Sequence, residues 1–293
     1  MRTVWILVIA ILMMGVIGCG KTGVAVKPGT KIGDVRINPK DGAEMVWVPA
    51  GEFTMGSTDE QTAAALKELP KEYQEILKSF FDAEKPQRKV HLDGYWMYKY
   101  EVTVAQYRKF CEATKRSLPK APDWGWKENH PMVMVSWQDA ADYAKWAGVA
   151  LPTEAQWEKA ARGTDGRTYP WGNDWDVSKC ANSVGKELKS TYVVGSYPAG
   201  VSPYGCMDMA GNVLEWCKDW YDPKYYANAP TKNPTGPSAG VKIDLWSVNF
   251  EGARVLRGGS RNYLYRATFR CAFRYLDPSL RYNNFGFRCA KTP

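Results

Sequence analysis

A short acidic segment offers chemistry suited to a hard metal ion. Asp208, Gly211, Asn212, Val213 and Glu215 lie close together in the chain. Carboxylate oxygens and free backbone carbonyls are the ligands that Ca²⁺ prefers. The alternative is that the two acids only cap turns and pair with arginine. We expect this segment to bind a structural calcium ion.

Arginine alternates with aromatic residues in the C-terminal part of the chain. Such side chains dominate binding hot spots, because each buries a large area at a small entropic cost. The alternative is that the aromatic residues are core and the arginines bridge loops, as we expect for Phe269, Phe273, Phe285 and Phe287. The residues expected to recognise a ligand at the surface are Arg261, Asn262, Tyr263, Tyr265, Tyr275 and Tyr282.

Other classes of site find little support. The sequence has seven cysteines but no Cys-x-x-Cys pair, and its two histidines, His91 and His130, have no nucleophile-like neighbour. Zinc binding, a nucleophilic triad and a Walker-type phosphate loop are therefore not expected. The net charge of +8 is diffuse, which favours solubility or anionic glycans and lipids over nucleic acid.

The N-terminus has the features of an export signal. After a basic start, an apolar run extends from Val4 to Ile17; it is shorter than the roughly 20 residues of a membrane span and fits a signal peptide. The residues up to Cys19 are typical of a lipobox. We expect a signal peptide at 1–18, a lipidated Cys19 and a tether at 19–42, which would anchor the protein to the periplasmic face of the outer membrane or to the cell surface. An ordinary signal peptide or a membrane anchor is the alternative.

Helix signals stand out in the middle of the chain. Thr103, Ser136 and Thr153 each precede an apolar periodic stretch and are good N-cap residues. Gly148 and Gly163 follow the second and third stretches as stop signals. Three helices are therefore expected to begin directly after these caps.

The rest of the chain predicts short elements in one domain. Residues 45–48 and 53–55 have strand character, and a helical pattern broken at Pro70 predicts a helical insertion over residues 60–86. Beyond residue 163, turns and short strands predominate. We expect a single α+β domain over residues 43–291, without internal repeats.

Several short sequence motifs occur in the order that is typical of one known family. They are Met45 to Ser57, Tyr100 to Thr103, His130 to Trp137, Leu151 to Glu158, Tyr169 to Asn173, Asp208 to Trp216, Arg257 to Ser260 and Asn284 to Arg288. Over nearly all of residues 45–290 the chain resembles the formylglycine-generating enzyme, or sulfatase-modifying factor, family. The resemblance implies an α+β fold related to C-type lectins, with little regular secondary structure.

The same resemblance implies a copper-dependent oxidation, but the two cysteines that would bind the copper are missing from this chain. Enzymes of that family use copper and oxygen to oxidise the cysteine of a Cys-x-Pro-x-Arg peptide to formylglycine. Their two copper-binding cysteines follow the Gly-Gly-Ser turn, where residues 261–270 of this chain contain none. Because Cu(I) requires soft ligands such as thiolates, copper is not expected. A sulfur–carbon-forming branch is discounted, because the chain lacks its histidines and its extra domain.

Calcium ligands are also implied by the resemblance. They would be the side chains of Asp208 and Glu215 with the carbonyl groups of Gly211 and Val213. A second family calcium site would begin at Asn182, but no acidic ligand is evident downstream.

Two disulfides are candidates in an exported chain. The resemblance implies structural positions for Cys271 and Cys289, but their usual partners are replaced by alanine. These two cysteines are therefore expected either to pair with each other or to remain buried thiols. Cys180 and Cys206 are the second candidate pair.

The segment from Arg257 to Arg288 also resembles the variable segment of lectin-like proteins that retroelements diversify, in which a rigid fold presents a ligand-binding face. We therefore expect an exported, lipid-anchored binding or accessory module. Its peptide or glycan ligand would lie in a groove bordered by Ser260 and Asn284, and nucleic acid is not an expected partner. The alternative is a formylglycine-generating-type oxidase with a non-standard site, acting in sulfatase maturation.

Overall fold

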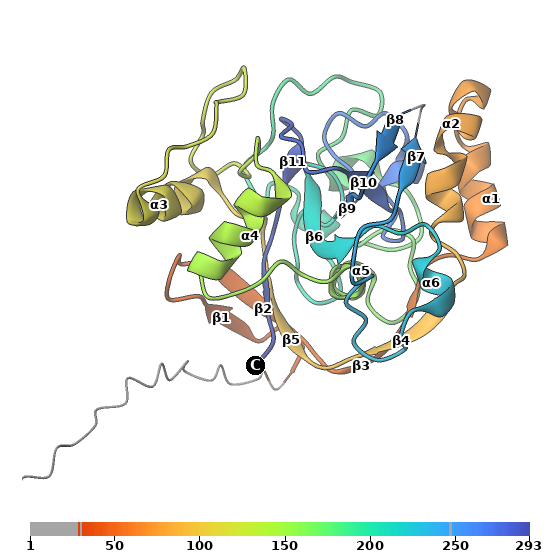
Figure 1. Ribbon diagram of the computed structural model, residues 1–293, viewed down its shortest axis with the longest axis horizontal. Coiled ribbons are helices and arrows are strands. Elements are labelled where there is room, and N and C mark those ends of the chain that lie inside the picture. The colour runs from red at the N-terminus through yellow and green to blue at the C-terminus, as the bar shows by residue number, and fades with distance from the viewer. Residues whose placement is uncertain (1–28, 30, 246–247) are drawn as a thin grey trace, which may run out of the picture.

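Two four-stranded sheets organise the chain in this computed structural model, which describes residue 29, residues 31–245 and residues 248–293. The strand orders are β1-β2-β5-β12 and β10-β9-β6-β11, and β3-β4 and β7-β8 form separate hairpins. Neighbouring strands run antiparallel, except that β11 is parallel to β6. Figure 1 shows the second sheet between α3 and the α1–α2 pair, which lie on opposite sides of the domain.

The elements are short and are joined by long loops. The strands are β1 (Val35–Ile37), β2 (Glu44–Val48), β3 (Gly51–Met55), β4 (Arg88–Leu92), β5 (Tyr95–Tyr98), β6 (Leu214–Trp220), β7 (Ile243–Leu245), β8 (Val248–Phe250), β9 (Arg254–Arg257), β10 (Tyr275–Asp277), β11 (Phe285–Gly286) and β12 (Ala290–Lys291). The helices are α1 (Asp59–Lys67), α2 (Lys71–Asp82), α3 (Val104–Thr114), α4 (Trp137–Trp146), α5 (Glu154–Arg162), α6 (Tyr225–Asn228) and the short 3-10 helices η1 (Val177–Lys179), η2 (Pro198–Gly200) and η3 (Arg266–Phe269). This is the predicted α+β class with little regular structure.

Capping boxes begin the three predicted helices. The side chains of Thr103, Ser136 and Thr153 each accept a hydrogen bond from the backbone N–H of the residue three positions later. The side chain of that later residue accepts a hydrogen bond from the backbone N–H of the capping residue. Because these bonds satisfy N–H groups that the first turn leaves unpaired, α3, α4 and α5 start where the sequence predicts.

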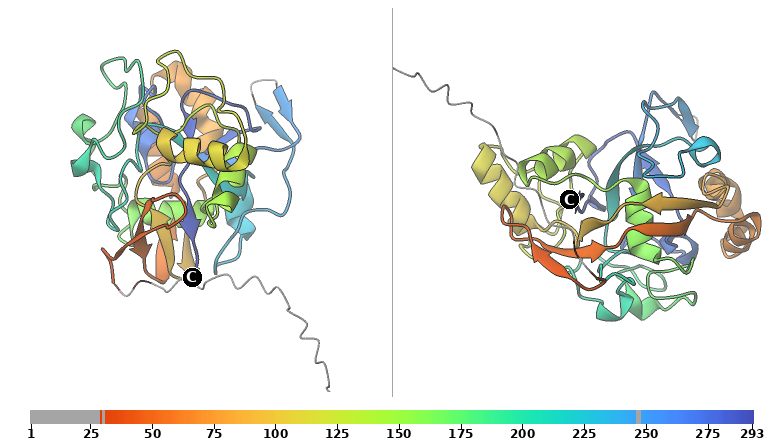
Figure 2. Two further views of the ribbon diagram at one scale, coloured as in Figure 1. Left: turned by 90° about the vertical axis from the view of Figure 1, so that its left-hand side faces the viewer. Right: turned by 90° about the horizontal axis from the view of Figure 1, so that it is seen from below.

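The predicted helical insertion is a hairpin of α1 and α2, broken at Pro70. It stands at the right-hand edge of the domain in Figure 1 and in the right-hand view of Figure 2. Phe80 of α2 stacks on Tyr275, with 5.2 Å between ring centroids, and Phe81 packs on Phe273 at 5.4 Å. Helix α2 of the hairpin therefore packs against the C-terminal segment through aromatic side chains.

The N-terminal boundary of the domain lies earlier than predicted. Residues 35–37, assigned to the tether, form strand β1 and pair with β2. Two polar residues that follow, Asn38 and Asp41, are buried. Asp41 accepts hydrogen bonds from the hydroxyls of Tyr98 at 2.7 Å and Tyr143 at 2.6 Å. Residues 1–28, with Cys19, lie outside the described residues. No helix in the described part is long and apolar enough to cross a membrane.

Candidate functional site

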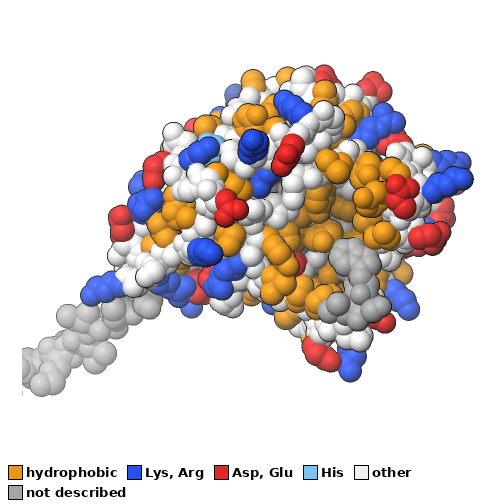
Figure 3. Space-filling model, turned by 90° about the horizontal axis from the view of Figure 1, so that it is seen from above, with side chains coloured by type: hydrophobic (Ala, Val, Ile, Leu, Met, Phe, Trp, Pro, Cys, Tyr) orange, Lys and Arg blue, Asp and Glu red, His pale blue; other side chains and the backbone are white. Residues whose placement is uncertain are grey.

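A groove of about 430 Å³ lies among β8, β10, β11 and the loop after β9. Its volume is within the range of ligand pockets. Figure 3 shows apolar side chains gathered around a hollow on the upper face of the domain. The lining residues are Phe250, Asn262, Tyr263, Tyr275, Leu276, Asp277, Pro278, Leu280, Tyr282, Asn284 and Phe285. Five of the residues predicted from the sequence to contact a ligand are thus brought together.

Three short polar side chains meet at one border of the groove. Asn284 Nδ2 lies 3.3 Å from both Ser260 Oγ and Asn262 Oδ1, and Ser260 Oγ also donates to Asn262 Oδ1. Ser260 is held by the turn before it: a Cβ on Gly259, whose φ is +69°, would meet the Thr268 carbonyl oxygen at 2.9 Å. Of the two predicted border residues, Asn284 lines the groove, whereas Ser260 is 0% exposed and lies behind it.

Three tyrosines supply the aromatic wall of the groove. Tyr263 and Tyr275 meet edge to face at 6.4 Å, while Tyr282 packs on Phe285 at 4.9 Å. Burial raises the pKa of Tyr263 well above its ordinary value, and burial followed by Asp277 raises that of Tyr275 to about 12. These phenols stay neutral at physiological pH and can donate hydrogen bonds to a ligand.

Two predicted contact residues lie elsewhere. Arg261 is only 5% exposed; its guanidinium packs over Trp124 and donates to the carbonyl of Leu188 at 2.6 Å. Tyr265 packs on Tyr73 of α2 at 5.1 Å. The sequence prediction of surface recognition is therefore wrong for Arg261, which ties the loop to its neighbour, and Tyr265 contacts the helical hairpin instead of the groove.

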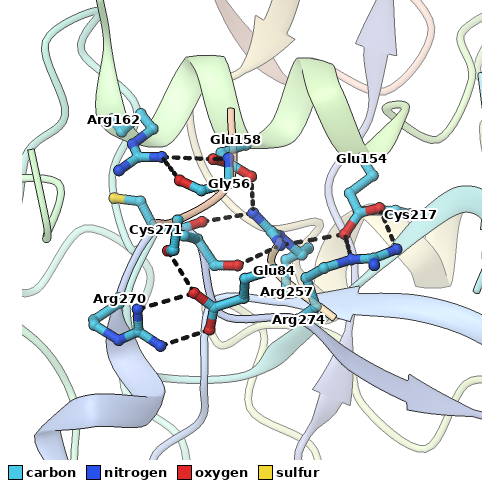
Figure 4. A network of polar contacts seen from close by, with 12 residues as sticks. Gly56, Glu84, Glu154, Glu158, Arg162, Cys217, Arg257, Arg270, Cys271 and Arg274 are labelled. Atoms are coloured by element: carbon cyan, nitrogen blue, oxygen red, sulfur yellow. Dashed lines mark hydrogen bonds and ion pairs between the residues drawn. The ribbon is translucent and has the colours of Figure 1, made fainter. Parts of the chain in front are cut away.

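A buried ionic network fixes the backbone beside the groove (Figure 4). Arg257 of β9 binds Glu158 of α5 at 2.6 Å and also donates to the carbonyls of Cys271 at 2.6 Å and Ala272 at 3.0 Å. Further pairs are Arg162 with Glu158, Arg274 with Glu154 and Arg270 with Glu84. The network joins α5, the end of the helical hairpin and the C-terminal segment.

The six described cysteines are all free and buried. Cys271 and Cys289 therefore follow the second of their two expected alternatives and are buried thiols, and the candidate Cys180–Cys206 disulfide is not formed. The members of each pair belong to different hydrophobic clusters: Cys271 and Cys206 lie in one cluster, Cys289 in a second and Cys180 in a third. Their thiols are buried singly among apolar side chains, where a cysteine behaves as a small hydrophobic residue.

The acidic segment forms a tight turn inside the protein. Asp208, Gly211 and Asn212 have positive φ angles of 57°, 83° and 58°, and a Cβ on Gly211 would meet the Ala181 carbonyl oxygen at 2.2 Å. The Asn212 side chain donates to the carboxylate of Glu101 at 2.7 Å. The turn therefore holds Asp208 near two further buried acids, Glu101 and Glu215.

This acidic cluster carries more negative than positive charge. Glu101, Asp208 and Glu215 are 1%, 7% and 0% exposed, and the nearby guanidinium of Arg288, 0% exposed, binds Glu215 at 2.7 Å. Burial and then the charges of Asp208 and Glu215 raise the pKa of Glu101 well above its ordinary value. Burial also raises the pKa of Asp208 to about 6. A divalent cation beside Asp208 would offset this negative charge.

The contacts of Glu215 limit how such an ion could bind. Its Oε2 accepts from Trp157 Nε1 and Arg288 Nε, and its Oε1 accepts from Arg288, all at 2.7 Å. In the described part of the chain, no group of three or more His, Cys, Asp or Glu side chains is placed to hold a metal. Carbonyl oxygens of the turn would therefore have to complete the coordination sphere.

Some functional residues escaped sequence reasoning. In the sequence, Glu101 is marked only by its place in one of the family motifs, and Phe250 and Leu280 of the groove have no distinguishing local pattern. A buried acid between apolar neighbours, as in Tyr100-Glu101-Val102, is the one signal that could have marked Glu101, because an unpaired carboxylate is rarely buried.

Comparisons with known proteins agree with this architecture. Residues 31–293 match the sulfatase-modifying factor enzyme 1-like domain. The chain is 31% identical to a formylglycine-generating enzyme of Mus musculus over 84% of this chain and 74% of that protein. It is 32% identical to one of Thermomonospora curvata over 88% of this chain and 97% of that protein. The solved structure of PvdO from Pseudomonas aeruginosa superposes with a TM-score of 0.68 at 26% identity, covering 92% of this chain and all of PvdO.

Proposed function

The chain belongs to the sulfatase-modifying factor enzyme 1-like family, and from that premise we propose that it is a binding or accessory module without oxidase activity. Its ligand is a peptide or a glycan that lies in the groove beside the hydrogen-bonded Ser260 and Asn284. The alternative is the activity that its relatives' names state, the generation of formylglycine.

The observation that carries the proposal is the composition of the groove. Its lining contains tyrosines, asparagines, apolar side chains and the carboxyl group of Asp277 but no thiol, and the described cysteines are all buried. Burial raises the pKa of Cys271 to about 12, so its thiolate is not available to a soft metal. Neutral phenols and amides on an apolar floor suit an uncharged peptide backbone or a sugar.

Two experiments separate binding from oxidation. Metal analysis of the purified protein is expected to find calcium without copper. Incubation with copper, oxygen and a Cys-x-Pro-x-Arg peptide, followed by mass spectrometry, is expected to leave the cysteine intact, as in a control peptide with serine in its place. Stoichiometric copper together with catalytic formation of the aldehyde would refute the proposal.

Ligand classes are distinguished by peptide and glycan arrays probed with the intact domain. Tyr282, 46% exposed, lines the groove, and Tyr192, 36% exposed, lies outside it. Both pack edge to face on one aromatic neighbour, so they make a matched pair. Tyr282→Ala should weaken binding at least about tenfold, and Tyr192→Ala should leave it unchanged. Equal effects would exclude this groove as the site.

Lipid anchoring and calcium complete the proposal. Cys19 after an apolar run would carry the lipid, which holds the domain at a bacterial membrane. Mass spectrometry of the N-terminal peptide from wild-type protein and from Cys19→Ala tests this directly. An unmodified cysteine in the wild type would remove the anchor from the proposal but leave the binding function in place.

A further inference from the structure

A second pocket adjoins the groove and has a different chemistry. The two share Pro278. The second pocket is lined by Trp137, Gln138, Trp220, Glu251, Gly252, Arg254, Pro278 and Ser279. Its single guanidinium, that of Arg254, is its most distinctive feature, because an arginine can bind an anion and the groove has no basic side chain in its lining.

Arg254 is held flat between two indole rings. Its Cζ lies 3.6 Å from the ring centroid of Trp137 and 3.4 Å from that of Trp220. The two faces of the guanidinium are thus covered, and its N–H edge remains available. Of its nitrogens, Nη1 donates to the carbonyl of Lys218 at 2.8 Å. No carboxylate of the described chain forms an ion pair with Arg254.

Four of the other arginines that pack on aromatic rings, Arg116, Arg257, Arg270 and Arg274, form ion pairs, whereas Arg261 over Trp124 donates to the carbonyl of Leu188 instead. Arg116 lies over Phe110 and binds Asp142 at 2.6 Å. Arg270 lies over Phe81 and binds Glu84 at 2.5 Å. Arg254 lacks such a partner, and burial, only partly opposed by Asp219, lowers its pKa to about 10. It is therefore a partly desolvated cation without a bound counter-charge. Removing a cation from water is unfavourable in free energy unless an anion binds to it.

We propose that Trp137, Arg254 and Trp220 form an anion-binding subsite that takes a carboxylate. The planar fork of a guanidinium matches a carboxylate with two parallel hydrogen bonds. Glu251 at the rim of the pocket, 84% exposed and 3.5 Å from Lys242, disfavours a multiply charged anion such as phosphate more than a single negative charge. The chemistry of the pocket therefore favours carboxylate.

The source of the carboxylate follows from the adjoining groove, and this step alone rests on the proposed binding function. A peptide in the groove would contribute an acidic side chain or its C-terminus, and a glycan would contribute a uronic acid. Array binding of acidic peptides and of uronate-containing glycans distinguishes the two sources. Whichever class binds, Arg254→Lys should weaken it at least about tenfold, because lysine keeps the charge but lacks the flat fork.

The subsite itself is tested with acetate alone, so the result does not depend on any groove ligand. The reporter is the indole N–H of Trp137, which donates to the carbonyl of Cys217 at 2.8 Å; its NMR signal is assigned by its loss in Trp137→Phe. Acetate should shift this signal saturably in the wild type, while chloride at equal ionic strength should not. Phosphate should produce a smaller shift than acetate.

Two variants complete the test. In Arg254→Lys the acetate shift should disappear, whereas in Arg116→Lys, where the arginine already has an acidic partner, it should persist. Equal unfolding midpoints for the two variants would establish that both are folded. Non-saturable shifts, identical shifts with chloride, or an unchanged acetate response in Arg254→Lys would overturn the subsite.

Discussion

Replacement of Asp208 by asparagine should change stability in opposite directions with and without calcium. Burial raises the pKa of Asp208 from its ordinary 3.8 to about 6. That difference corresponds to about 3 kcal/mol of destabilisation by the ionised carboxylate at a pH well above 6. Without calcium, Asp208→Asn should therefore stabilise the protein by up to about 3 kcal/mol. Asparagine tolerates the positive φ of this position and can still accept the hydrogen bond from Gly195.

Calcium should reverse the effect. A ligand at about 1,000 times its dissociation constant stabilises the folded state by about 4 kcal/mol. The wild type would gain this stabilisation, and Asp208→Asn would lose most of it, because one charged ligand is gone. At saturating calcium and neutral pH, the variant should then be the less stable protein.

The pH dependence has a defined sign. Because the folded-state pKa of Asp208 lies above the unfolded one, its contribution favours folding below about pH 4 and is lost as the pH rises through 6. In EDTA, the wild type should lose stability relative to Asp208→Asn over this interval. Saturating calcium should abolish that loss at neutral pH.

Urea unfolding followed by tryptophan fluorescence, in EDTA and in calcium, measures these differences. Asp219→Asn is the matched control: Asp219 is 3% exposed, burial raises its pKa to about 7, and it lies outside the calcium candidate. Its effect should be the same with and without calcium. If Asp208→Asn also had the same effect in both conditions, the assignment of calcium to this turn would be wrong.

Three further outcomes are expected. Phe80→Ala should lower the free energy of unfolding by about 3–5 kcal/mol, because Phe80 is 1% exposed; a urea unfolding change below about 1 kcal/mol would mean that the helical hairpin is not packed on Tyr275. Glu158→Gln should cost about 3–5 kcal/mol in the same assay by leaving Arg257 and Arg162 under-compensated, while exposed Glu68→Gln should cost about 1 kcal/mol or less; similar costs would contradict the network. Iodoacetamide should label the described cysteines only after unfolding, and without reductant, since all are buried and free; labelling that required a reductant would reveal a disulfide.

Local chemistry explains what the sequence could predict. The starts of α3, α4 and α5 follow from caps whose hydrogen bonds span three residues. The four phenylalanines expected in the core are buried, at 0%, 1%, 4% and 0% exposure for Phe269, Phe273, Phe285 and Phe287. These features depend on neighbours in the chain or on hydrophobicity alone.

Contacts between distant segments explain what the sequence could not predict. The hydrogen bond from Asn212 to Glu101 joins residues 111 positions apart, and Arg288 reaches Glu215 across 73 positions. Arg261 lies inside because Trp124 and Leu188 approach it from elsewhere in the chain. The sequence does not show which distant residues will meet, so it predicts Arg261 at the surface although this side chain is buried.

The hydrogen bonds from Arg257 to main-chain carbonyl groups bear on how freely nearby side chains can be changed. Its guanidinium donates hydrogen bonds to the backbone carbonyl oxygens of Cys271 and Ala272. Every amino acid has such an oxygen, so these bonds do not depend on which side chains stand at exposed positions nearby. Three exposed side chains make no hydrogen bond with Arg257: Leu264, Leu280 and Tyr282, which are 55%, 50% and 46% exposed. A combinatorial library randomised at these three positions would sample new specificities while retaining one backbone, so the domain is suited to serve as a display scaffold.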